Sequence, residues 1–224
     1  ESRGALTLRV VGGLSTDEIA KAFLVPKSTV AQRIVRAKKT LAGVAFEVPD
    51  RSEWPQRMST VLSVIYLIFN EGYAASSGRL WFREELCAEA LRLGRVLAAL
   101  APDEAEVHGL VALMEFQSSR LRARVDAEGA PILLENQDRT RWDRAQIQRG
   151  VTALGAAAQA LQHRGSGWGP YALQAALAEC HAVAPSTADT DWHRIVMLYD
   201  ALLGLTTSPV VALNRAVAVA MADP

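Results

Sequence analysis

The feature that most constrains the fold is a succession of stretches of about 15 to 20 residues after residue 41, each rich in Ala and Leu and bounded by Pro or Gly. Ala and Leu favour helices, Pro and Gly end them, and strand-forming residues are sparse here. The sequence therefore predicts an all-α protein. The expected helices are 54–70, 83–100, 103–121, 142–163, 170–183, 190–203 and 209–221, with a hairpin or ordered loop at 123–142 and a further helix at 5–11.

The expected helices show a recurring pattern, in which a helix ends, a proline follows and a new helix begins, at 97–107, 180–190 and 205–214. This weak internal repeat is typical of arrays of helical hairpins. Residues 213–224 look like the first helix of a tetratricopeptide unit without its second. We therefore expect an internal fragment of a longer protein, with an apolar strip of Val210, Leu213 and Val217 exposed on the last helix.

Charge is distributed unevenly along the chain. Residues 1–41 hold eight basic side chains against three acidic ones, a net charge of +5, and the remaining residues carry −5. A polyanion would attract the short basic head and repel the acidic remainder. The longest apolar stretches, such as 64–69, are too short to cross a bilayer, and only Cys87 and Cys180 occur. We expect no membrane segment and a reducing, cytoplasmic setting.

The basic head contains a pattern for two helices joined by a tight turn. Ser15 and Glu18 have the spacing of a capping box, and Pro26 suits the first position of the following helix. On that second helix an apolar stripe is formed by Val30, Ile34, Ala37 and Leu41, at spacings of four, three and four. This combination indicates a helix-turn-helix.

The opposite face of the second helix is polar and basic, and no acidic residue occurs between positions 19 and 46. A recognition helix of this kind enters the major groove of duplex DNA. Lys27, Ser28 and Gln32 are candidates for base contacts, and the later basic residues for phosphate contacts. The alternative is a capped helical pair with a solvated basic face. The candidate DNA-binding residues are Lys27, Ser28, Thr29, Gln32, Arg33, Arg36, Lys38 and Lys39.

The segment GGLSTDEIAKAFLVPKSTVAQRIVRAKKTL, residues 12–41, resembles region 4 of the extracytoplasmic-function sigma factors, the bacterial RNA polymerase subunits that recognise promoters. It departs from their usual pattern at Leu24, where a glycine commonly opens the turn. VIYLIFNEGY (64–73), LCAEALRLGRVLAAL (86–100), NQDRTRWD (136–143) and SPVVALNRAVAVAM (208–221) are similar to the subgroup with a C-terminal tetratricopeptide-like extension.

The resemblance implies a helix-turn-helix at 1–42, a linker at 43–52 and a helical extension at 53–224. It implies binding of the −35 element of promoter DNA with core RNA polymerase, and an extension that regulates activity or binds a protein partner. It also implies a region 2, absent from this sequence, that reads the −10 element. A one-component transcription regulator, whose helical repeats sense a peptide or small molecule, shares the same pattern.

Other constellations point to structure rather than chemistry. Cys180 and His181 are adjacent and lack a metal-ligand spacing, so a core thiol and a surface imidazole are expected. Asn70 and Gly72 are expected to end a helix. The charged residues around Trp142 are expected to form ion pairs. The sequence contains no glycine-flanked serine elbow and no P-loop, and we predict no catalytic residue, no metal and no cofactor.

Overall fold

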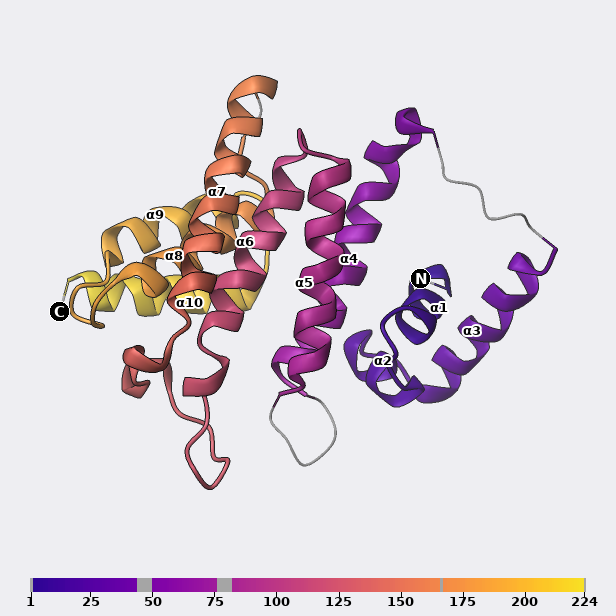
Figure 1. Ribbon diagram of the computed structural model, residues 1–224, viewed down its shortest axis with the longest axis horizontal. Coiled ribbons are helices and arrows are strands. Elements are labelled where there is room, and N and C mark those ends of the chain that lie inside the picture. The colour runs from indigo at the N-terminus through magenta and orange to yellow at the C-terminus, as the bar shows by residue number, and fades with distance from the viewer. Residues whose placement is uncertain (1, 44–49, 76–81, 166, 224) are drawn as a thin grey trace. The chain divides into compact units, whose positions relative to one another are not determined.

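The computed structural model describes residues 2–43, 50–75, 82–165 and 167–223. Within these ranges the chain is helical with a single isolated β-bridge, which confirms the all-α fold class (Figure 1). The expected linker at 43–52 lies largely outside the described residues. The helices are α1 (Ser2–Val10), α2 (Thr16–Ala22), α3 (Lys27–Leu41), α4 (Trp54–Tyr73), α5 (Glu84–Leu100), α6 (Ala105–Ser119), α7 (Arg144–Arg164), α8 (Pro170–Val183), α9 (Trp192–Leu203) and α10 (Pro209–Ala222).

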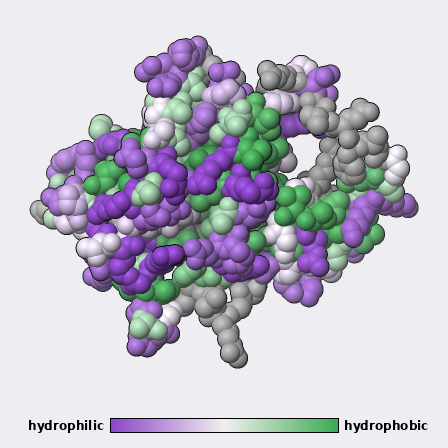
Figure 2. Space-filling view, viewed as in Figure 1, coloured by the Kyte–Doolittle hydropathy of each residue, from purple (hydrophilic) through white to green (hydrophobic). Residues whose placement is uncertain are grey.

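The chain forms two compact units, Glu1–Leu93 and Gly94–Pro224. Helix α5 begins in the first unit and ends in the second. The face seen in Figure 2 is mostly hydrophilic over the second unit, whereas hydrophobic and hydrophilic residues alternate over the first. No helix within the described ranges is both long and apolar enough to span a bilayer.

One predicted helix end is wrong. Helix α4 continues through Asn70 and Gly72 to Tyr73. A Cβ on Gly72 would lie 2.7 Å from the backbone nitrogen of Cys87 and 2.8 Å from its sulfur. Gly72 therefore allows α5 to approach α4 closely, and this tertiary contact outweighs the low helix propensity of glycine.

The first unit is built around α1, α2, α3 and α4. Helix α1 contacts α2, α3 and α4, and α2 contacts both α3 and α4. Leu8, Leu14 and Ile19 are fully buried in this unit, and so is Ile68 of α4. Removal of these apolar side chains from water holds the short helices together, because α2, at seven residues, is too short to be stable alone.

Helix α6 lies at the centre of the second unit, packed against α7 and α8. Twelve of its fifteen residues are buried, as expected for a helix surrounded by protein. The one buried acid of α6, Glu115, is 1% exposed and forms ion pairs with Arg95 of α5 and Arg149 of α7. The carboxylate is thereby neutralised, which a buried charge requires.

Helices α8, α9 and α10 follow in sequence, each packed on the one before it. Leu173, Cys180, Ile195 and Leu202 belong to their shared apolar core. As expected, Val210, Leu213 and Val217 are exposed on α10, at 62%, 65% and 54%.

Residues 123–142 form an ordered loop with a hairpin-like start, in which Val125 and Pro131 make the antiparallel bridge. Two short 3-10 helices follow, at Leu134–Asn136 and Arg139–Arg141. Arg139 donates hydrogen bonds to the backbone oxygens of His181 and Ala184, and its guanidinium lies 4.6 Å from the centre of the Trp142 ring system.

Two acids near the end of this loop cap the helices that follow them. Asp138 accepts a hydrogen bond from Thr140 N at 2.9 Å, and Asp143 accepts one from Gln146 N at 3.0 Å at the start of α7. Backbone capping and the stacking of Arg139 on Trp142 help to hold the loop in place.

Candidate nucleic-acid interface

The capping box at the start of α2 is present as predicted. Ser15 N donates to the Glu18 carboxylate at 2.6 Å, and Glu18 N donates to Ser15 Oγ at 3.2 Å. Two backbone donors that lack partners inside the helix are satisfied in this way. The capping box fixes where α2 begins and thus how it leads into the turn.

The turn between α2 and α3 depends on Leu24. This residue has φ +52°, the left-handed conformation that glycine adopts without strain, and its side chain is 92% exposed. Val25 N donates to Ala20 O at 3.0 Å, which closes the end of α2. Leucine therefore makes the turn that glycine commonly makes in the family, at a conformational cost of about 1 kcal/mol.

The inner face of α3 follows the predicted stripe. Val30, Ile34 and Ala37 are buried at 0%, 9% and 4% exposure, and Leu41 is half-buried. The helix begins at Lys27, so Pro26 occupies the N-cap rather than the first helical position. The carbonyl oxygen of Pro26 accepts hydrogen bonds from Thr29 N and Val30 N.

The outer face of α3 carries the sequence-predicted DNA-binding residues. Arg33 and Thr29 are half-buried at the flanks of the helix, and the other six are exposed: Lys27, Ser28, Gln32, Arg36, Lys38 and Lys39. Helical geometry places Ser28, Gln32 and Lys39 along one line, at spacings of four and seven. Helix α3 carries no acidic residue of its own, and its exposed outer face suits a polyanion.

One of these cations has an acidic neighbour that the sequence pattern does not predict. Lys27 Nζ lies 2.8 Å from Asp17 Oδ2, and both side chains are more than half exposed. An exposed pair of this kind is weak and is exchanged readily for a phosphate contact. Asp17 is ten residues earlier in the sequence, so only the fold of the tight turn reveals its position.

Val35 also lies on this outer face but is not among the DNA-binding residues predicted from the sequence. Its side chain is 65% exposed and lies between Gln32 and Lys39 on the outer line of α3. A helical projection of α3 would have found it, since Val35 falls outside the stripe of Val30, Ile34 and Ala37. An apolar group in this position is suited to contact the methyl group of thymine.

The helix-turn-helix packs against α4, the next long helix in the chain. A Cβ on Gly12 would lie 2.8 Å from the side chain of Ile68 on α4, so the two chain segments touch. Glu18, besides closing the capping box, forms an ion pair with Arg83 at 3.1 Å. The recognition helix therefore belongs to the same compact unit as α4 and the start of α5.

The expectation for His181 is wrong. The residue is half-buried rather than on the surface, and its ring packs edge-on against Trp192, with 5.4 Å between ring centres. Burial, together with the nearby charges of Arg120 and Arg139, lowers the pKa of His181 to about 4, so the imidazole is neutral at pH 7. Cys180 is buried, as expected. The described residues contain no group of three or more His, Cys, Asp or Glu side chains arranged to hold a metal ion.

Comparisons with known proteins match two segments of the chain. Residues 1–41 match sigma-70, region 4, and residues 57–158 match a family of unknown function (DUF6596). An uncharacterized protein of Rhizobium meliloti (strain 1021) is 50% identical over 217 residues, which are 96% of this chain and 50% of that protein. No solved structure matches.

The chain thus spans about half the length of the curated relative that it matches. The region 4 match ends at the last residue of α3, so it covers the capping box, the turn and the recognition helix. Residues 1–41 are thus similar to sigma-70 region 4, the region that binds the −35 element in sigma-70 proteins.

Proposed function

We propose that this chain is the promoter-recognising and regulatory part of a transcription initiation factor of the extracytoplasmic-function group. In this proposal α3 enters the major groove at the −35 element while the protein is bound to core RNA polymerase in the cytoplasm. The observation that carries the proposal is the exposed polar and basic face of α3, opposite its buried stripe, in the segment similar to region 4.

The residues of α3 divide into two roles in this proposal. Ser28, Gln32 and Val35 lie where base edges are reached, Gln32 by hydrogen bonds and Val35 by contact with a thymine methyl group. Arg33 and Arg36 lie beside them and are suited to phosphate contacts. The other candidates that we assign to phosphates or the groove edge are Lys27, Thr29, Lys38 and Lys39.

We further propose that residues 53–224 form a tetratricopeptide-like extension joined through residues 43–52 to the helix-turn-helix at 1–42. The successive packing of α6 on α7 and α8, α8 on α9 and α9 on α10 supports an array of helical hairpins. The contacts of α1 and α2 with α4 give the extension a physical link to the DNA-binding head. Through this link the extension regulates the head or connects it to a protein partner.

The experiment is a comparison of promoter binding and run-off transcription by the full-length protein assembled with core RNA polymerase. Arg33→Ala combined with Arg36→Ala should weaken promoter binding and reduce its dependence on log salt concentration by up to about two units. Arg92→Ala is the matched control, because Arg92 is an exposed arginine of α5 that pairs with Glu89. It should leave both properties unchanged.

An unchanged salt dependence in the double variant would remove α3 from the DNA interface. Tight binding of a symmetric duplex by a dimer of the full-length protein without polymerase would favour the one-component regulator instead. Equal transcription by the protein with and without its extension would leave the extension without a regulatory role.

A further inference from the structure

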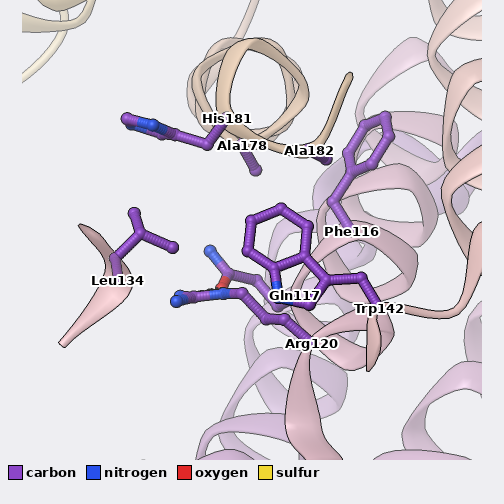
Figure 3. A pocket seen from close by; sticks show the side chains of 8 residues that line it. All are labelled: Phe116, Gln117, Arg120, Leu134, Trp142, Ala178, His181 and Ala182. Atoms are coloured by element: carbon purple, nitrogen blue, oxygen red, sulfur yellow. Dashed lines mark hydrogen bonds between the residues drawn. The ribbon is translucent and has the colours of Figure 1, made fainter. Parts of the chain in front are cut away.

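The second unit contains a small, partly enclosed pocket between α6, α8 and the loop that precedes α7. Eight residues line it: Phe116, Gln117, Arg120, Leu134, Trp142, Ala178, His181 and Ala182. Figure 3 shows Gln117 and Arg120 on one side of the open space and His181 on the other, with Trp142 and Leu134 facing each other across it. The cavity volume is about 30 Å³, enough for two or three water molecules.

The polar groups on the α6 side are hydrogen-bond donors. Arg120 Nε and Nη2 both donate to Gln117 Oε1, at 3.1 and 2.6 Å. Because a guanidinium has no acceptor, this contact fixes the orientation of the Gln117 amide. Its nitrogen is turned away from Arg120 and points toward the middle of the pocket (Figure 3).

The electrostatic environment of the pocket is positive, although the second unit as a whole is acidic. Residues 94–224 contain 14 acidic and 11 basic side chains, yet none of the eight lining residues is acidic. Behind the Trp142 ring lies the guanidinium of Arg139, 4.6 Å from the ring centre. Besides burial, the positive charges of Arg120 and Arg139 lower the pKa of His181, so its ring is neutral at pH 7.

The remaining walls are apolar and would enclose a short aliphatic stem. Phe116 and Trp142 are 2% and 3% exposed, and Ala178 and Ala182 leave space because their side chains are small. The small volume, the hydrogen-bond donors and the positive charge of Arg120 favour a small group that accepts hydrogen bonds and carries negative charge. A carboxylate on a short chain meets these conditions.

We propose that this pocket binds a carboxylate group, held by the amide nitrogen of Gln117 and the guanidinium of Arg120 with its stem against Trp142. The carboxylate belongs either to a small free acid or to an acidic side chain of a partner protein. In both cases the ligand binds to the extension and not to the helix-turn-helix.

The test is an NMR titration of the ¹⁵N-labelled chain with sodium propionate at constant ionic strength. The signals to follow are the side-chain amide of Gln117 and the indole N–H of Trp142, assigned from Gln117→Ala and Trp142→Phe. We expect saturable shifts of both signals with propionate. Propionamide, which has nearly the same shape without the charge, should bind about tenfold more weakly or worse.

Two variants and a control test the assignment to this pocket. Arg120→Gln removes the charge, and Ala178→Leu fills the cavity from α8 without changing any charge, so each should weaken propionate binding by about tenfold or more. Arg122→Gln is the control, because Arg122 is exposed and does not line the pocket. The spectrum of each variant shows whether it is folded.

The capped peptide acetyl-Gly-Glu-Gly-amide distinguishes the two sources of the carboxylate. Binding about tenfold tighter than propionate would assign the pocket to an acidic side chain of a partner, and equal or weaker binding to a small free acid. Absence of saturation with both probes would overturn the proposal. Propionamide binding as well as propionate, or full binding by both folded pocket variants, would overturn it too.

Discussion

Glu18 and Arg83, 65 positions apart in the sequence, form an ion pair of 3.1 Å that joins the start of α2 to the start of α5. Glu18 is 7% exposed and also closes the capping box with Ser15. The same carboxylate thus determines where the helix-turn-helix begins and attaches it to the helices that follow.

Glu18→Gln should lower the free energy of unfolding by about 1–2 kcal/mol, because it weakens the cap and removes the ion pair. A double-mutant cycle with Arg83→Met, measured by urea unfolding, should give a coupling of about 1 kcal/mol. Glu85→Gln is the control, since Glu85 pairs with the same arginine but is 68% exposed. If Glu85→Gln lowered the free energy of unfolding as much as Glu18→Gln does, the burial of the Glu18 contact would not account for its contribution to stability.

Leu24→Gly should raise the free energy of unfolding by up to about 1 kcal/mol. Glycine adopts the φ of +52° without strain, although its greater freedom in the unfolded chain offsets part of the gain. Leu133→Gly is the matched control, an exposed leucine with φ −60°, and it should be neutral or destabilising. Thermal unfolding of both variants decides the matter, and a less stable Leu24→Gly protein would mean that the Leu24 side chain contributes to the turn.

Much of the helix-turn-helix follows from local sequence. Ser15 and Glu18 form their cap through contacts within four residues, and the burial of Val30, Ile34 and Ala37 follows from helical periodicity. Asp17 and Arg83 were not found as partners because their contacts join segments that are distant in sequence.

The helices that follow the helix-turn-helix show the same limit of local reasoning. The role of Gly72 depends on its contact with Cys87, and the burial of His181 depends on the packing of Trp192. Arg139 could not be assigned from the sequence either, because the two backbone oxygens that it binds lie more than 40 residues later. Helix propensity and charge pattern say nothing of such contacts.

Val35→Ala should remove the sensitivity of DNA binding to one thymine methyl group. With the best duplex selected from a random pool, replacement of the contacted thymine by uracil should weaken binding of the unchanged protein about threefold to fourfold, the value of one methyl contact. The Val35→Ala protein should bind both duplexes equally. Val10→Ala, at an exposed valine of α1, should keep the full effect of the methyl group. If no thymine in the duplex shows this dependence on Val35, its proposed base contact is wrong.

His181 should make the protein less stable in mild acid. Its pKa falls from 6.5 to about 4 on folding, so the unfolded chain binds the proton at higher pH than the folded one. The contribution is complete above pH 6.5 and is lost as the pH falls toward 4. Between pH 6.5 and 5 the loss is about 1.5 kcal/mol.

Urea unfolding at several pH values checks this expectation for His181. His181→Gln should show a shallower decline in stability below pH 6.5, whereas His163→Gln, at an exposed histidine, should decline as the unchanged protein does. Parallel declines in all three proteins would contradict a buried neutral His181.

Site-specific photo-crosslinking shows whether the outer face of α3 lies on the −35 element, as proposed. Gln32→p-benzoylphenylalanine is introduced into the full-length protein, which is assembled with core RNA polymerase on a promoter that it transcribes. We expect crosslinks to bases about 35 positions upstream of the transcription start, and none from the same group at Thr152, an exposed residue of α7. Absence of a crosslink from position 32, or crosslinks only to other parts of the promoter, would contradict the claim.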